Sequence, residues 1–178
     1  MASFGERMIR AAKLDASLYE EVEADKGAMG QAMSVVVLSS LAAGIGSLQA
    51  TGIKGLVFGT VLTLAGWYIW AFITYFVGTK WLPEPQTEAD YGELLRTIGF
   101  SSTPGLLRVL GIIPFLYSII FLVTGIWMLI AMVIAVRQAL DYKSTWRAVG
   151  VCIIGWVIQA ILFLIFASVF GGFGSATA

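Results

Sequence analysis

The 178-residue chain contains no histidine and a single cysteine, Cys152. Histidine is the commonest general base and a very common metal ligand, so its absence argues against most acid–base and zinc chemistry. One cysteine cannot form an internal disulfide, and Cys152 lies in an apolar run, where we expect a small buried hydrophobic residue. The sequence shows no catalytic constellation, and we therefore predict neither an enzyme nor a bound cofactor or metal.

Charge is also scarce. Charged residues make up 12% of the chain, against about a quarter in a typical soluble domain, and 58% of the residues are hydrophobic. The formal net charge is +0, so no overall field attracts nucleic acid, and we expect no nucleic-acid partner. Because the polar shell of a soluble protein is missing, lipid is the expected solvent. The composition predicts an all-α, polytopic membrane helix bundle.

The first 28 residues are the polar exception. We predict that segment 1–28 is a cytoplasmic, amphipathic N-terminal region beside the membrane. Phe4, Met8 and Ala12 fall on one helical face, and Asp15 is a plausible N-cap for a second short helix.

Three apolar runs have the length of about 20 residues that one helical crossing needs. They are 29–49, 55–79 and 146–170, and none of them contains an acidic residue. The last run is followed by a small uncharged tail, 171–178, which we predict to lie outside the cytoplasm. The membrane domain as a whole is predicted to cover 29–170.

A fourth apolar stretch, 97–136, is too long for one crossing. As a single helix it would extend roughly 60 Å, twice the hydrocarbon thickness of a bilayer. Pro104 and Pro114 interrupt it, so we predict two spans, 99–113 and 119–136. The chain then has five transmembrane helices.

The distribution of basic residues supports five crossings over four. Lys and Arg in short loops set the orientation of a membrane protein. With five crossings, one side carries nearly all the basic loop residues and the other keeps only Lys54. We therefore predict an integral membrane protein with the N-terminus in the cytoplasm and the C-terminus outside.

Arg108 is the only charged residue in the long stretch, and burying it in a span costs on the order of 2–3 kcal/mol. Three roles remain open: reaching the outer interface, donating to carbonyls freed by Pro104 or Pro114, or holding a lipid phosphate. Gln159 in the last run is a candidate hydrogen-bond partner across helices.

Small residues are the other recurrent feature of the apolar runs. Gly44, and the Gly55 and Gly59 pair at the start of the second run, are candidate helix-packing positions, because small residues let helices approach closely in lipid. The acidic loop between Lys80 and Arg96 fits no calcium-loop spacing, and we read its carboxylates as a solvated surface.

Several short patterns along the chain resemble those of bacterial members of the YIP1 family. They are Met8-Ile9-Arg10, Leu14-Asp15, Tyr19 to Asp25, Gly30-Gln31-Ala32, Gly99-Phe100 with Pro104, and Trp127. The resemblance implies a small protein of a bacterial cytoplasmic membrane, with five membrane spans and a cytoplasmic N-terminus. Eukaryotic relatives are linked to vesicle trafficking and prenylated small GTPases. This chain lacks their long N-terminal region and has only Leu18-Tyr19-Glu20 where they carry Asp-Leu-Tyr-Gly-Pro.

Two functions fit these observations. The first is a non-enzymatic membrane protein that organises lipids or partner proteins, as a homo-oligomer or as a subunit of a larger membrane assembly. The second is a small-solute or ion transporter or channel, suggested by the proline-broken stretch and Arg108. Transporters usually carry several polar groups at mid-membrane, and this sequence has few. The first function is the better prediction.

Overall fold

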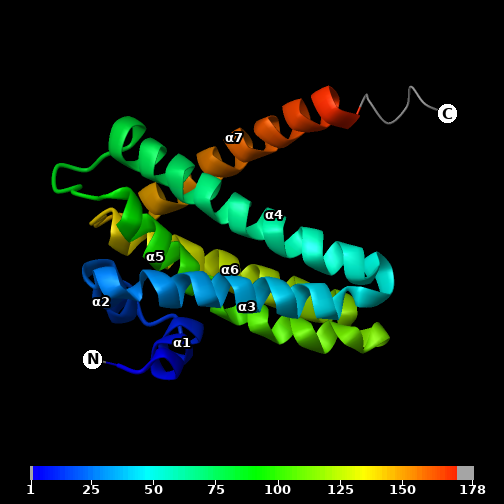
Figure 1. The fold of residues 1–178 in the computed structure, drawn as a ribbon. Helices are drawn as coiled ribbons and strands as arrows, with labels where there is room; N and C mark the ends of the chain where they lie inside the picture. The colour runs from blue at the N-terminus through cyan, green and yellow to red at the C-terminus, as the bar shows by residue number, and fades with distance from the viewer. Residues whose placement is uncertain (1, 172–178) are drawn as a thin grey trace.

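The computed structural model describes residues 2–171, and within them the chain is almost entirely helical and has no strand. Four long helices form the body of the described structure (Figure 1). They are α3 (Met29–Gly46), α4 (Leu48–Phe76), α6 (Tyr117–Ala139) and α7 (Thr145–Gly171). The all-α, multi-pass membrane architecture predicted from composition is confirmed. The predicted tail, 171–178, lies outside the described residues apart from the backbone of Gly171.

Four segments are long and apolar enough to cross a membrane as single helices. They are Lys26–Gly46, Leu48–Trp81, Pro114–Ala139 and Thr145–Ile165. The second is longer than α4 because a π-helical turn, η2 (Val77–Trp81), extends that helix. These segments overlap four of the five predicted spans.

The polar N-terminal region folds into two short helices, α1 (Phe4–Ala12) and α2 (Ala16–Ala24), followed by a 3₁₀ turn, η1 (Lys26–Ala28). The predicted N-cap is confirmed, since the Ser17 backbone N–H donates to the Asp15 carboxylate at 3.0 Å. Helix α2 is more than a surface helix, because Leu18 and Tyr19 are fully buried in the main core. We call α1, α2 and η1 together the head.

Successive helical passes, α3, α4, α5 (Tyr91–Ser101) with η3 (Thr103–Ile112), α6 and α7, run along the bundle alternately away from the head and back (Figure 1). At the far end, the Gln49 side chain donates to the Ile112 carbonyl at 3.3 Å and joins the α3–α4 turn to the end of the third pass. At the head end, the Gln138 amide donates to Glu20 at 2.7 Å and joins the end of α6 to α2. Successive passes are therefore joined alternately at the far end and at the head end of the bundle.

The third pass differs from the predicted transmembrane helix 99–113. It consists of α5 (Tyr91–Ser101) and a long 3₁₀ helix, η3 (Thr103–Ile112), so the prediction of five transmembrane α-helices is corrected to four. Helix α5 begins early because Asp90 and Glu93 form a capping box. Pro104, at the start of η3, has no N–H to continue the α-helical ladder. Together α5 and η3 extend about 36 Å at the usual rises, enough to match their neighbours.

The first turn at the far end connects α3 and α4. Helix α3 ends at Gly46, and the helical backbone is interrupted at Gly52, which has a positive φ of 64° and lies within the predicted connection, 50–54. The turn after the third pass is a 3₁₀ turn, η4 (Pro114–Leu116), close to the predicted position.

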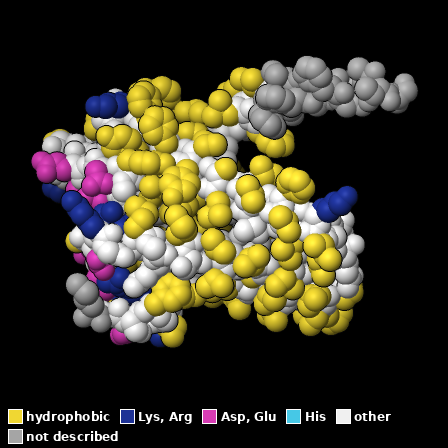
Figure 2. Space-filling view, viewed as in Figure 1, with side chains coloured by type: hydrophobic (Ala, Val, Ile, Leu, Met, Phe, Trp, Pro, Cys, Tyr) yellow, Lys and Arg dark blue, Asp and Glu magenta, His cyan; other side chains and the backbone are white. Residues whose placement is uncertain are grey.

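Charged side chains gather at the head end, and hydrophobic side chains cover the body (Figure 2). All 11 acidic residues lie outside the four apolar segments. Helix α7 begins at the head end and diverges from α4 (Figure 1). Its residues 160–165 are all exposed, so the described outer part of α7 has left the bundle.

Candidate functional site

The head is locked to the bundle by two buried arginines. Arg7, only 2% exposed, pairs with Asp25 at 2.8 Å and with Glu21 at 3.0 Å, and it donates to the Gln31 amide oxygen of α3 at 3.0 Å. Burial opposes the charge of Arg7, but the hydrogen bonds to Asp25 and Glu21 outweigh it and raise the pKa of the guanidinium. The arrangement ties α1, α2 and α3 together.

Arg96 makes the second connection, from α5 to the end of α2. Its guanidinium donates to the Val22 carbonyl at 2.9 Å and also to the Glu23 carbonyl. These are carbonyls of the last turn of α2, which have no partners within that helix. Arg96 thereby holds the head against the third pass. Sequence reasoning placed this residue at the end of a loop and missed its role, because nothing local marks a partner 74 positions away.

An acidic recess of about 490 Å³ opens between the head and the α6–α7 loop. Glu20, Glu23, Glu93 and Asp141 line it together with Arg137 and other residues. Burial, and then the negative charges of Asp141, Glu93 and Glu20, raise the pKa of Glu23 to about 8. Within the described part of the chain, no group of three or more carboxylates or thiols is placed to hold a metal ion. The acidic side chains that line the recess are therefore close enough to influence the ionisation of Glu23.

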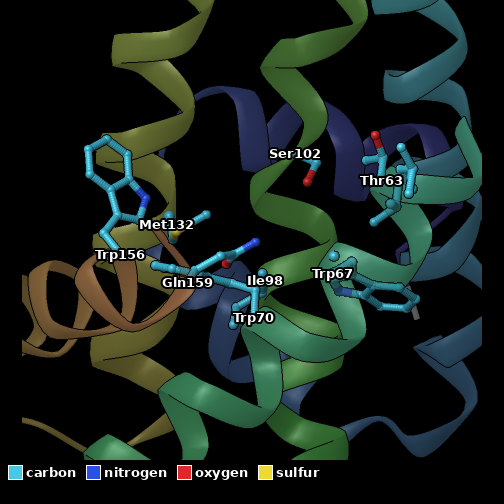
Figure 3. Close-up of a pocket in the computed structure, with 11 residues that line it drawn as sticks. Thr63, Trp67, Trp70, Ile98, Ser102, Met132, Trp156 and Gln159 are labelled. Atoms are coloured by element: carbon cyan, nitrogen blue, oxygen red, sulfur yellow. The ribbon is translucent and has the colours of Figure 1, made fainter. Parts of the chain in front are cut away.

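The second recess has a volume of about 500 Å³, is lined by residues of all five passes and is widely open at the side. Figure 3 shows its walls. Most of the lining comes from α4, with Trp67 and Trp70 among its residues, and from Trp156 and Gln159 of α7. The other lining residues are Val36 of α3, Ile98 and Ser102 of the third pass, and Met132 of α6. We call this space the central cavity. A largely apolar cavity with a few polar groups is the usual form of a small-molecule site.

The central cavity lies at the middle of the membrane-crossing segments. Val36 is the middle residue of the segment Lys26–Gly46. The lining residues of α4, from Leu62 to Trp70, fall around the middle of Leu48–Trp81. Trp156 and Gln159 lie near the middle of α7, Thr145–Gly171. The cavity is therefore about half the hydrocarbon thickness away from either head-group region.

Two hydrogen-bonding groups in the cavity wall lack protein partners. Trp70 is 6% exposed, and its indole Nε1 has no hydrogen-bond acceptor. Gln159 makes no hydrogen bond to another described residue, and its amide reaches toward α4, with Nε2 4.0 Å from the position that a Gly66 Cβ would occupy. By contrast, the Trp67 indole donates to the Leu95 carbonyl at 3.1 Å. A buried donor without an acceptor is uncommon in proteins.

Arg108 lies in η3 and turns toward α6. Its Nε donates to the Thr124 hydroxyl at 3.1 Å, and its guanidinium carbon lies 5.2 Å from the centre of the Phe121 ring. Among the described residues no carboxylate pairs with it, and its contacts do not include carbonyls freed by Pro104 or Pro114. Arg108 and Gln159 therefore contact different parts of the bundle.

The three predicted packing glycines have different surroundings. Gly44 lies against α4, since a Cβ there would be 2.9 Å from the Leu56 side chain and 3.2 Å from its Cα. Gly55 faces Thr51 of its own helix. Gly59 has nothing within 4 Å of its Cβ position. The glycine in closest contact is one that was not singled out: a Cβ on Gly46 would be 1.9 Å from the Arg108 carbonyl oxygen.

Cys152 is half-buried between apolar residues of α6 and α7.

The sequence alone does not predict the central cavity. The spacing of Trp67 and Trp70 along α4 does not by itself show which rings face a neighbouring helix.

Comparison with known proteins gives one match. A family model described as Yip1 domain matches residues 18–175, which is nearly the whole chain. No curated protein and no solved structure matches it.

Proposed function

The chain belongs to the Yip1 domain family, and from this membership and its apolar helices we propose a non-enzymatic integral membrane protein that assembles within the bilayer. The absence of histidine supports a role without catalysis, as does the position of all acidic residues outside the apolar segments. We propose further that the membrane is a bacterial cytoplasmic membrane, with the head in the cytoplasm, because the basic residues concentrate at the head end.

The observation that carries this proposal is the open angle between α4 and α7. Residues 160–165 of α7 are exposed on every side, although they belong to a transmembrane segment. On α4, Gly59 is open and shares a helical face with Thr63 and Gly66, at spacings of four and seven residues. Small residues of this kind let a second transmembrane helix approach closely. A second copy of this chain is the partner we propose.

We expect Gly59→Leu to shift the protein from a dimer to a monomer. The added side chain has room in the single chain, because nothing lies within 4 Å of the Gly59 Cβ position, but it would obstruct an approaching helix. Native mass spectrometry in a mild detergent measures the oligomeric state. Gly30→Leu is the matched control, because Gly30 is equally open but lies on α3.

A monomeric wild-type protein without co-purifying subunits would contradict the proposed assembly. A different membrane protein could instead co-purify with the chain and be released by Gly59→Leu. That result would support the α4 face as a docking surface and would contradict the proposal that its partner is a second copy. Equal loss in Gly30→Leu and Gly59→Leu would show that the shift reflects damage to the fold rather than the α4 surface.

Transport of a small solute is the second candidate, and the central cavity at mid-membrane favours it. The cavity wall, however, has only neutral polar groups, and Arg108 contacts α6 elsewhere in the bundle. A liposome flux assay decides this point. A flux that disappears in Gln159→Leu and persists in Arg108→Leu would support transport through the cavity.

A further inference from the structure

We propose that the bilayer is thinner beside the head than beside α4, because phospholipid head groups of the head-side leaflet lie over α1 near the middle of α6. This inference goes beyond the proposed assembly and does not depend on it, since it concerns α1 and α6 rather than the α4 face. It rests on how far α1 reaches along α6, on where exposed apolar side chains end, and on the polarity of α1.

Helix α1 lies beside the bundle rather than beyond its end (Figure 1). The indole Nε1 of Trp127 donates at 2.9 Å to the carbonyl of Ala12, the last residue of α1. Trp127 is at the middle of the membrane-crossing segment Pro114–Ala139. The end of α1 therefore lies near the midpoint of that segment, where a bilayer of uniform thickness would have its hydrocarbon core.

Exposed apolar side chains cover unequal lengths of the helices. On α6 they extend from Tyr117 to Ile130, about 20 Å at the α-helical rise, and the remaining residues, 131–139, are buried or half-buried. On α4 they extend from Ile53 to Phe76, about 35 Å. The hydrocarbon core of a bilayer is about 30 Å thick. The exposed part of α4 can span it, whereas that of α6 falls short by about 10 Å.

The shorter exposed length of α6 does not arise from a shift of the helix along its axis. Leu140, directly after α6, lies against Gly78, where an added Cβ would collide with its side chain. The Tyr142 hydroxyl donates to the Gly78 carbonyl at 2.9 Å. The two helices are therefore level at the head end. The head covers the rest of α6, through α1 at its middle and through Glu20 of α2, which accepts from Gln138 near its end.

The polarity of α1 identifies lipid head groups as its neighbours. Arg7 and Arg10 turn into the head, where both pair with Glu21 of α2. Ile9 and Lys13, one helical turn apart, are exposed. A lysine in the middle of the hydrocarbon core is costly. With phosphates beside Lys13 and the upper acyl chains beside Ile9, α1 has the usual surroundings of an interfacial helix. A bilayer meets a short apolar surface by thinning.

The test measures the depth of nitroxide labels on the full chain in vesicles of dioleoyl phosphatidylcholine and dioleoyl phosphatidylglycerol. The labels are attached at Ile130→Cys or Phe72→Cys in a Cys152→Ala background. Collisions with oxygen and with a water-soluble nickel chelate report the depth of each label. Phe72 lies six residues before Gly78, and Ile130 lies ten residues before Leu140. In a bilayer of uniform thickness the Phe72 label is therefore the shallower one. We expect the reverse, with the Ile130 label shallower by about 4 Å.

Two variants of Lys13 test the part played by its charge. Lys13→Leu is expected to move the Ile130 label deeper, because an apolar side chain lets hydrocarbon cover the end of α1. Lys13→Arg keeps the charge and is the matched control, with no expected change in depth. Thermal unfolding of each labelled variant in one detergent checks that it is folded. The same depth in both Lys13 variants would contradict the contact between Lys13 and lipid phosphate.

A Phe72 label shallower than the Ile130 label would overturn the proposal. So would an Ile130 label that collides with neither reagent, because a bound protein rather than lipid would then cover that side of α6. The oligomeric state is measured separately. A dimer with the Phe72 label shallower would contradict this inference alone, and a monomer with the Ile130 label shallower would contradict only the proposed assembly.

Discussion

Arg108 shows how a single charged side chain is accommodated in the apolar part of the chain. It donates to Thr124 of α6 and lies over the Phe121 ring, whereas the sequence left open an interfacial position, a backbone carbonyl or a lipid phosphate. A hydroxyl and an aromatic face are weak partners compared with a carboxylate. The residue therefore depends on this local contact for part of the energy that its burial costs.

A double-mutant cycle measures that contact. We expect Thr124→Val to destabilise the wild type, because Arg108 Nε loses its acceptor, and to have little effect in an Arg108→Leu background. The expected coupling energy is about 1 kcal/mol, typical of hydrogen bonds between transmembrane helices. Thermal or SDS-induced unfolding in detergent provides the four stabilities. Additive effects would show that the two side chains do not interact energetically.

Glu23 is an acidic residue of the head whose raised pKa makes the stability of the fold depend on pH. Burial and the nearby acidic groups raise its pKa from 4.5 to about 8 in the folded chain. The folded state therefore holds a proton that the unfolded state has released, and stability falls as pH rises between these two values. Below pH 4.5 both states are protonated, and above pH 8 both are ionised, so the full cost is present only at the alkaline end.

We expect Glu23→Gln to remove this pH dependence. The variant unfolds at a higher temperature than the wild type above pH 8, and the difference narrows toward pH 4.5. Melting curves in one detergent across that range check the prediction. Glu6→Gln is a suitable control, since Glu6 is an exposed carboxylate of α1 in the same head. Parallel profiles for wild type and Glu23→Gln would contradict the prediction.

At the scale of elements, two glycines bring α3 and η3 into close backbone contact. The Arg108 carbonyl oxygen occupies the place where a Cβ on Gly46 would lie, and Gly105 of η3 is similarly close to the Ser39 side chain of α3. A 3₁₀ helix is narrower than an α-helix and brings its backbone nearer to a neighbour. The close packing of η3 against α3 therefore requires glycine at the contact positions, Gly46 on α3 and Gly105 on η3.

Gly46→Ala is expected to be strongly destabilising. The added Cβ would meet a backbone atom, which cannot turn aside as a side chain does, so α3 and η3 have to separate. Gly30→Ala in the same helix has open space and is expected to be neutral or to stabilise by up to about 1 kcal/mol through helix propensity. The unfolding midpoint of Gly46→Ala should fall well below that of the wild type, whereas that of Gly30→Ala should be unchanged or higher. Similar midpoints for the two variants would contradict the packing argument.

The third pass also shows what local patterns predict and what they miss. Its two prolines marked an interruption in the apolar stretch, and the position of the following turn was predicted within a few residues. The early start of α5 was missed, because Asp90 and Glu93 were read as loop charges although they form a capping box. The 3₁₀ form of η3 was also missed, because it depends on contact with α3 and α6.

For the whole molecule, the alternating passes make a definite prediction about sidedness. Ser17 in the head and Lys143 in the α6–α7 loop lie at one end of the bundle, and Thr51 lies near the other. In a Cys152→Ala background, Ser17→Cys and Lys143→Cys should react with an impermeant maleimide only from the cytoplasmic side, and Thr51→Cys only from the outside. Reaction of Lys143→Cys and Thr51→Cys from the same side would contradict the five-pass arrangement.

Composition and hydropathy by themselves determined that this chain is a helical membrane protein, that its charges gather at one end, and that its course alternates. These properties are local, because the length and polarity of each segment decide whether it can exchange water for lipid. The tertiary structure alone decided the partner of Arg108, the contact at Gly46, the anchoring by Arg96, and the cavity beside Trp70 and Gln159. Each of these arises where helices distant in sequence meet, and how closely two helices meet depends on every side chain between them.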